Sequence, residues 1–260
     1  MWITLITLRI KSKFIYRASS FIDIVGRLLS FLFRIMIWVA LLGSGARFDT
    51  TLEQMITYLV ITSIVVALTS STTGGEITMR VRTGSISADL IKPISLKVLL
   101  FFSDLGSNIF NFLVIFLPVC VIIVLGFGFL PPPSIYHFLA FLLTVILGTA
   151  LQFYYNYILG LFAFWFFSNP FISWHFQNVT NLFNGQILPI WLYPAGLAMA
   201  TVFLPFRYFT YEPIALYLGK TPLSNLPTIL IIMLTWLLLL YLIERFLWYR
   251  ACKKLVLQGG

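Results

Sequence analysis

The chain has 260 residues, of which 60% are apolar, 17% are aromatic and only 10% are charged. Soluble domains carry roughly 25% charged residues, so the composition excludes a soluble domain and indicates an integral membrane protein. The net charge of +9 does not indicate nucleic-acid binding. The cations cluster at the ends of apolar stretches, where they orient spans and contact anionic lipid headgroups. Two cysteines, Cys120 and Cys252, are too few for a disulfide framework or a metal site.

Residues 1–20 predict an amphipathic interface helix on the cytoplasmic surface of the membrane. Basic residues such as Arg9 and Lys13 are interleaved with apolar ones such as Ile10 and Phe14. No long apolar core with a small-residue cleavage site follows, so the pattern differs from that of a signal peptide. It is typical of a helix that lies in the membrane interface.

Six apolar segments predict six transmembrane helices, because about 20 residues cross the hydrocarbon layer. The fourth segment is longer than a span requires, and we expect it to project into the cytoplasm. The fifth is the most polar, and its lone His175 has no second ligand at metal spacing. The six segments are Phe21–Leu42, Met55–Thr73, Leu105–Leu125, Ile135–Phe167, Ile172–Leu188 and Pro227–Phe246.

The first span contains three charged residues. Asp23 and Arg27 are four residues apart and can pair on one helix face. Arg34 lies deeper, about 20 Å along the helix from Phe21 at 1.5 Å per residue, so it must face protein or a water-filled path. We favour a buried ion pair for Arg34 over contact with a transported substrate. Of the acidic residues, we expect only Asp23 inside the bilayer and place Asp104 at its surface.

Polar side chains at helical spacing mark further candidate seams or pathway positions. We expect those of the third span to join neighbouring helices, as amides often do in membranes. Those of the fourth span share a face with Gly148 and predict a helix–helix seam that can also line a pathway. The hydroxyls of residues 69–73 can bond to carbonyls of their own helix. The candidate pathway or interface residues are Arg34, Asn108, Asn111, Gln152, Asn156, Asn181 and Asn184.

The segment 74–98 between the second and third spans is charged and must lie in water. A short amphipathic helix is predicted over Glu76–Arg82 and is ended by Gly84. Ser85 or Ser87 can cap a second helix, which Pro93 ends. Two short helices on the cytoplasmic face could receive force from a soluble partner protein that supplies energy. The residues expected to act there are Glu76, Arg80, Arg82, Gly84, Asp89 and Pro93.

The segment 185–222 is apolar but repeatedly interrupted by proline. Broken apolar segments are tolerated at membrane depth only when protein buries them or they line a cavity. We therefore expect short re-entrant helices on the outer face, broken at Pro189, Pro194, Pro205 and Pro213. Aromatic residues of this segment are expected at headgroup level, namely Trp191, Tyr193, Tyr208, Tyr211 and Tyr217.

The distribution of basic residues predicts the topology. The amino-terminal helix, the segment 74–98 and the carboxy-terminal tail each hold four Lys or Arg residues, whereas the expected external segments hold only Arg47, Arg207 and Lys220. By the positive-inside rule, both termini lie in the cytoplasm. We expect an all-α, multi-pass membrane domain that spans residues 1–260.

No motif for catalysis is present. The chain lacks the G-x-x-x-x-G-K-[ST] phosphate loop, the G-x-S-x-G elbow and the H-E-x-x-H pair. A proton-coupled carrier would normally need buried carboxylates, and few are expected here. The chain is therefore not expected to be an enzyme.

The order of these features resembles the permease subunits of ABC-2 type exporters, and in particular their bacterial multidrug or antibiotic branch. One motif lies in the segment 74–98 and the other precedes the last span. The residues that carry the resemblance are Glu76, Gly84, Leu90 and Pro93 in the first motif, and Gly185, Pro189, Pro194, Leu204-Pro205-Phe206, Pro213 and Gly219 in the second.

The resemblance implies the transmembrane half of an exporter in the bacterial inner membrane. The partners would be a second permease, either another copy or a related chain, and two ATPase subunits that bind ATP and Mg²⁺. The helix Glu76–Arg82 would be the coupling helix that docks on the ATPase, and residues 1–20 would be the interface helix. This chain itself would hold no cofactor.

Two other functions are compatible with the sequence. An ATP-independent carrier or channel would follow an ion gradient and need no ATPase. A membrane-bound transferase or scaffold would use Arg34 and the segment 185–222 on a lipid-linked substrate. The aromatic, nearly uncharged spans favour an amphipathic or hydrophobic substrate such as a drug, a peptide or a lipid-like molecule.

Overall fold

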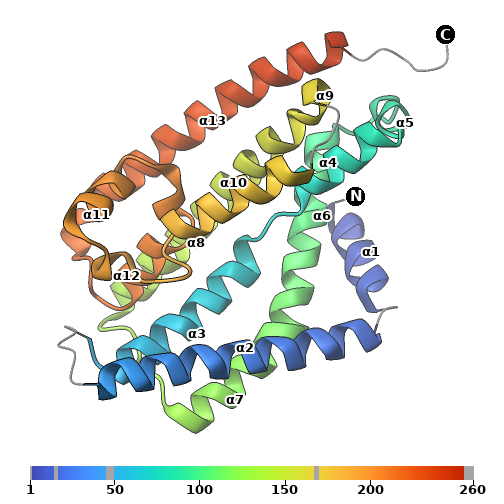
Figure 1. Cartoon of the computed structure of the whole chain (residues 1–260). Helices are drawn as coiled ribbons and strands as arrows, with labels where there is room; N and C mark the ends of the chain where they lie inside the picture. Colours follow the sequence, from blue (N-terminus) through green and yellow to red (C-terminus); the bar gives the residue numbers. More distant parts are fainter. Residues whose placement is uncertain (1, 15–16, 45–49, 167–169, 255–260) are drawn as a thin grey trace.

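The computed structural model describes residues 2–14, 17–44, 50–166 and 170–254, and every regular element in these ranges is helical (Figure 1). The elements comprise α-helices, one π-helical segment (η1) and three short 3₁₀ segments (η2 to η4). In chain order they are α1 Trp2–Phe14, α2 Arg17–Gly43, α3 Leu52–Thr69, α4 Thr73–Arg82, α5 Ile86–Leu90, α6 Leu96–Phe110, η1 Asn111–Phe116, α7 Leu117–Phe127, α8 Ile135–Leu161, α9 Ala163–Phe166, α10 Pro170–Phe183, η2 Ile190–Leu192, α11 Ala195–Val202, η3 Pro205–Tyr208, α12 Tyr211–Tyr217, η4 Leu223–Asn225 and α13 Leu226–Lys254.

Within the described residues, five helical stretches are long and apolar enough to cross a membrane, which indicates a multi-pass membrane protein. They correspond to five of the six expected spans. The segment expected as the fifth span forms α10, whose 14 residues extend only about 21 Å at 1.5 Å per residue. That is less than the roughly 30 Å of the hydrocarbon layer, so a six-span layout is not confirmed. The five stretches are Phe21–Gly43, Leu52–Arg82, Leu96–Phe127, Ile135–Phe166 and Leu223–Lys254.

Helix α8 is the central element, and it packs against α3, α4, α12 and α13. Its first turn is capped by the Ser134 hydroxyl, which accepts a hydrogen bond from the backbone N–H of His137. Two glycines on α8 permit close packing. A Cβ at Gly148 would lie 3.2 Å from the carbonyl oxygens of Tyr208 and Phe209, and one at Gly160 would lie 3.1 Å from the Cα of Gly74. The expected seam on α8 is therefore formed largely by its glycines.

The third span contains a local break in its α-helical geometry. Pro118 follows the π-helical segment Asn111–Phe116 and cannot donate the backbone hydrogen bond of an α-helix. Its ring also crowds the carbonyl one turn earlier, and widening of the preceding turn relieves that contact. The span ends at Gly128, whose φ of +82° lies in the region that glycine adopts without strain.

The segment 185–222 consists of short helices, as expected, and prolines occupy their starts. Pro189 precedes η2, Pro194 precedes α11 and Pro205 is the first residue of η3. Proline suits these positions because its missing N–H has no partner in the first turn of a helix. The location of this segment relative to the membrane stays a prediction.

The aromatic residues of this segment pack into the protein, and their position at headgroup level stays a prediction. Tyr208, Tyr211 and Tyr217 are between 2% and 6% exposed, so the protein core encloses them. Trp191 and Tyr193 are partly buried, and the Trp191 ring packs edge-on against Tyr58 of α3. The short helices are thus anchored to the bundle through their aromatic side chains.

Helices α4, α5 and α9 and the carboxy-terminal end of α13 lie toward the same end of the molecule, at the upper right of Figure 1. Helices α11 and α12 lie toward the opposite end. The charged segment and the proline-rich segment are therefore separated by the length of the bundle.

Candidate functional site

The segment 74–98 folds into two short helices joined by a tight turn. Helix α4 (Thr73–Arg82) is followed by Gly84, whose φ of +70° turns the chain toward α5 (Ile86–Leu90). Pro93 follows the end of α5 at Ile91. The expected pair of helices and its glycine turn are present.

The expected serine cap of the second helix is not formed. Ser85 stands at the N-cap of α5 but makes no capping hydrogen bond, and its hydroxyl contacts that of Thr83. Ser87 lies inside α5 and donates to the Gly84 carbonyl. A hydroxyl caps a helix well from a β-region residue, whereas Ser85 has φ −67° and ψ −12°, so its side chain cannot reach the helix amides.

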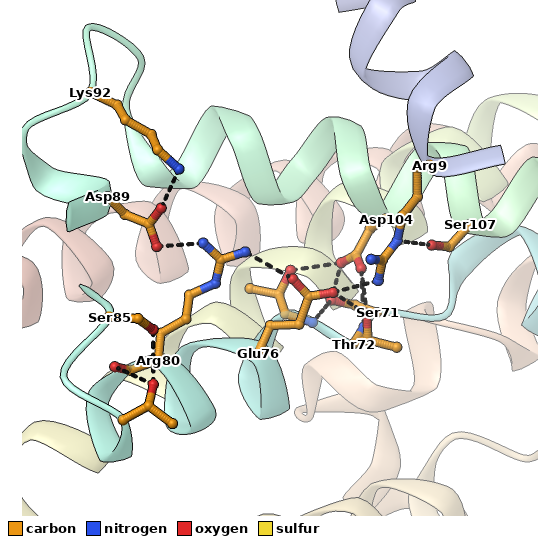
Figure 2. A network of polar contacts seen from close by, with 12 residues as sticks. Arg9, Ser71, Thr72, Glu76, Arg80, Ser85, Asp89, Lys92, Asp104 and Ser107 are labelled. Atoms are coloured by element: carbon orange, nitrogen blue, oxygen red, sulfur yellow. Dashed lines mark hydrogen bonds and ion pairs between the residues drawn. The ribbon is translucent and has the colours of Figure 1, made fainter. Parts of the chain in front are cut away.

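A chain of ion pairs links the two helices to the amino-terminal helix (Figure 2). Glu76 accepts hydrogen bonds from Arg9 of α1 at 2.6 Å and from Arg80, one turn along α4, at 3.3 Å. Arg80 also pairs with Asp89 of α5 at 2.5 Å, and Lys92 pairs with Asp89 at 2.7 Å. We call these five residues the Glu76–Asp89 network, and they join α1, α4 and α5.

Asp89 is the buried anion of the network, with its side chain only 7% exposed. Burial alone would raise the pKa of this carboxyl group, but hydrogen bonds from Lys92 and Arg80 and the charges of both side chains outweigh that effect. The pKa of Asp89 is therefore lower than its ordinary value, and the group remains ionised at neutral pH.

A second polar cluster lies beside the network and is centred on Asp104 of α6, which is 6% exposed. Its carboxylate accepts hydrogen bonds from the hydroxyls of Ser71, Thr72 and Thr73 and from the Thr72 backbone N–H (Figure 2). The carboxylate thus fixes the link between α3 and α4. Sequence reasoning missed this cluster, because we expected these hydroxyls to bond to their own helix and Asp104 to lie at the membrane surface. The signal in the sequence was the run of five hydroxyl residues at positions 69–73, which is more than one helix end needs.

The amino-terminal helix is held against α6 by close backbone packing as well as by charge. A Cβ at Gly106 would lie 2.9 Å from the carbonyl oxygen of Ile6. Arg9 donates from Nε to the hydroxyl of Ser107 at 3.0 Å while its terminal nitrogen pairs with Glu76. Helix α1 therefore has a fixed position relative to α4. Its predicted position on the membrane surface stays a prediction.

The outer surface of α4 and α5 exposes side chains that take no part in the Glu76–Asp89 network. Met79 is 60% exposed and Ile91 is 86% exposed. The side chain of Arg82, which lies between them in the sequence, is also exposed. The network residues Glu76, Arg80 and Asp89 are instead engaged within the protein. The segment thus has an inner, ion-paired side and an outer side that is free to contact another protein.

A second ion pair joins the start of α6 to the last helix. Lys97 pairs with Glu244 of α13 at 2.9 Å, and the Glu244 side chain is 3% exposed. A cavity of about 830 Å³ lies beside this pair and is bordered by Pro93 and Trp248. We expected only Asp23 inside the bilayer, which stays a prediction, and the burial of Glu244 within the protein was not expected. Asp23 is exposed whereas Glu244 is buried, because its partner Lys97 supplies the charge that makes burial tolerable.

Arg34 does not form the expected buried ion pair. Its side chain is exposed, and no ion pair to it exists among the described residues. It borders a cavity of about 210 Å³ between α2, α3 and the third span. This position favours the alternative role for Arg34, contact with a transported substrate.

The predicted amides occupy varied positions. Asn108 joins helices as expected, since its amide donates to the carbonyls of Leu68 and Ser70. Asn111 is the first residue of η1. Asn156 is buried and donates to the carbonyl of Gln152 in its own helix.

The two asparagines of the expected fifth span belong to α10 and its carboxy-terminal end. Asn181 accepts a hydrogen bond from Gln177, and Asn184 is 2% exposed and accepts one from the backbone N–H of Gln186. Four of the candidate amides, Asn108, Asn156, Asn181 and Asn184, thus make hydrogen bonds within the protein, and their role in a pathway stays a prediction. The side chain of His175 lies outside the residues whose side chains the structure describes.

The chain matches one known family over nearly its whole length. The model of the family described as "ABC-2 family transporter protein" matches residues 28–259. A comparison with curated proteins found no match.

Proposed function

The chain belongs to the ABC-2 family of transporter proteins, and from this premise we propose that it is the transmembrane permease subunit of an ATP-driven exporter. It forms half of the substrate pathway, and a second permease, identical or related, forms the other half. Two copies of a separate ATPase subunit bind ATP and Mg²⁺ and supply the energy. The complex lies in the bacterial inner membrane with both termini of this chain in the cytoplasm.

The observation that carries the proposal is the two-sided construction of α4 and α5. On the inner side, the Glu76–Asp89 network ties these helices to α1, and Gly74 packs closely on α8. On the outer side, Met79, Arg82 and Ile91 are exposed. A partner that pushes on the outer side would therefore move α4, α5, α1 and α8 together.

This construction refines the role expected for Glu76. Its carboxylate is occupied by Arg9 and Arg80, so it holds the coupling helix in position, while Met79, Arg82 and Ile91 contact the ATPase. The proposed mechanism is alternating access. ATP binding closes the two ATPase subunits and moves the docked α4–α5 segments together. The permeases then open a path to the outer face for an amphipathic or hydrophobic substrate.

The test is a pull-down of the tagged chain from its native host in a mild detergent, with the co-purifying proteins identified and ATP hydrolysis measured. We expect a stoichiometric ATPase with a phosphate-binding loop. The triple variant Met79→Asp/Arg82→Glu/Ile91→Asp should lose this partner because it places acidic groups on the proposed docking surface. The matched control is Ile187→Asp/Met199→Asp, which changes exposed apolar residues of the proline-rich segment and should keep the partner.

Two results would overturn the proposal. One is a wild-type chain that purifies alone, well folded and without ATPase activity. The other is an ATPase that remains bound to the triple variant as strongly as to the control.

A further inference from the structure

The cavity of about 210 Å³ between α2, α3 and the third span carries two arginines that the proposed coupling does not use. Arg27 and Arg34 both border it and are seven residues apart on α2. Seven residues are close to two turns of an α-helix, so both side chains lie on one side of α2. The guanidinium of Arg27 lies over the Phe116 ring, 4.3 Å from its centroid.

Neither arginine forms an ion pair among the residues that the structure describes. Asp23, one turn from Arg27, acts on it electrostatically without forming a close pair. A cation within a membrane span is costly, and such residues normally pair or mark a ligand pathway. The cavity therefore has an excess of positive charge.

Polar groups on the cavity wall add hydrogen-bonding capacity. Thr62 borders the cavity and is 2% exposed. The Ser63 hydroxyl donates to the Leu59 carbonyl and retains the ability to accept. Gln186 reaches the cavity from the end of the expected fifth span. Ser63 and Gln186 thus place polar groups on the cavity wall beside the two arginines.

The size and the apolar part of the wall limit the kind of ligand. The cavity has room for a compact anionic group but not for a whole lipid. Phe31, Val66 and Val119 line its remaining surface. On the same side of α2, one and two turns beyond Arg34, Ile37 is 43% exposed and Leu41 is 40% exposed, and both can pack against a hydrocarbon chain.

We propose that this cavity is a headgroup subsite for an anionic amphiphile, a molecule with a carboxylate or phosphate head and an apolar tail. Arg27 and Arg34 bind the head through charge-assisted hydrogen bonds, and the tail lies along α2. The part of the proposal that makes this molecule a transported substrate rests on the proposed exporter function. The binding itself does not.

The test uses the purified chain and the fluorescent probe 11-(dansylamino)undecanoic acid, with its neutral methyl ester as the matched ligand. Wild-type protein should bind the acid at least about tenfold more tightly than the ester, which corresponds to about 1.4 kcal/mol. Arg27→Gln/Arg34→Gln should abolish this preference. Arg245→Gln/Arg250→Gln, which removes two exposed cations from α13, should retain it.

The proposal is wrong if wild-type protein binds the acid and the ester equally. It is also wrong if the double variant in α2 keeps the preference. The comparison of acid with ester needs only wild-type protein, so poor folding of a variant does not remove the test.

Two further measurements separate the possible sources of the anionic head. Extraction of lipids from the purified protein identifies a resident lipid if anionic phospholipid accompanies the wild type and is depleted in Arg27→Gln/Arg34→Gln. Stimulation of ATP hydrolysis in the complex by the acid, but not by the ester, identifies a transported substrate. If no ATPase accompanies the chain, the exporter proposal fails. The preference for the acid over the ester still tests whether the cavity binds an anionic head.

Discussion

Glu76 is the residue at which α1 and α4 meet, because its two carboxylate oxygens are bound by arginines from different helices. The side chains of these three residues are between 22% and 35% exposed, and ion pairs with such access to water contribute only about 1 kcal/mol to stability. These ion pairs therefore serve mainly to orient α1 relative to α4. A salt bridge of this kind can fix the angle between two helices without being essential for folding.

We predict that Glu76→Lys lowers the stability of the permease by only about 1 kcal/mol but abolishes the ATP hydrolysis that depends on the permease. The new cation would face Arg9 and Arg80, which would displace α1 from α4. The measurement is ATP hydrolysis by the purified complex, compared with the ATPase subunit alone. Glu53→Lys is the control, since Glu53 is an exposed residue in the first turn of α3. Hydrolysis that remains coupled in Glu76→Lys would refute this role.

Asp89 gives a prediction about pH. Its pKa in the folded protein is lowered by Lys92 and Arg80, and its pKa in the unfolded chain is about 3.9. Its ionised form therefore contributes stability that is fully present above pH about 4 and is lost as the pH falls through the lower, folded-state pKa.

We expect the wild type to unfold at a higher temperature than Asp89→Asn at pH 7, by a difference equivalent to about 1–2 kcal/mol. The two should converge below pH about 4. Thermal unfolding of the detergent-solubilised proteins across this pH range checks the prediction. A difference that persists unchanged at pH 3 would show that the charge of Asp89 is not the cause.

Helix α4 packs closely against α8 because glycines lie at their contact. A Cβ at Gly74 would lie 2.9 Å from the backbone oxygen of Asn156, whereas nothing lies within 4 Å of a Cβ at the neighbouring Gly75. A backbone atom cannot move aside as the end of a side chain can. The seam thus depends on Gly74 and not on Gly75.

We predict that Gly74→Ala destabilises the protein by about 1–3 kcal/mol, as overpacking does in a close-packed core, and weakens coupling because α4 must move away from α8. Gly75→Ala should be neutral or stabilising by up to about 1 kcal/mol, since alanine favours the helix. Thermal unfolding and ATP hydrolysis of the complex check both variants. Equal behaviour of the two would show that close packing between α4 and α8 is unimportant.

For the whole molecule, the length of the apolar segments was sufficient to predict the five stretches that can cross a membrane. The positions of Gly and Pro predicted the pair of helices in the segment 74–98 and the short helices of the segment 185–222. These features depend on local composition and on Gly and Pro, which act within a few residues. The expected fifth span is not confirmed, because α10 has only 14 residues, fewer than the roughly 20 that cross the hydrocarbon layer.

The partners of individual charged residues could not be predicted in this way. Arg9 and Glu76 are 67 residues apart, and Lys97 and Glu244 are 147 residues apart, so their pairing depends on how the helices pack. The same reason explains why Asp104 and Glu244 were missed as buried carboxylates. It also explains why Arg34, expected to be paired, borders a cavity and has no ion pair with any residue that the structure describes.

If the outer side of α4 and α5 docks on an ATPase, as we propose, a cysteine at position 82 lies within reach of that ATPase, and a chemical cross-link from Arg82→Cys tests this. The background variant Cys252→Ser removes the exposed native thiol, since Cys120 is buried. A thiol-to-amine cross-linker added to the complex should join the permease to the ATPase from position 82. It should give no such product from Asn225→Cys, an exposed position in η4 beside the last span on the expected outer face. A product from position 225, or none from position 82, would contradict this account.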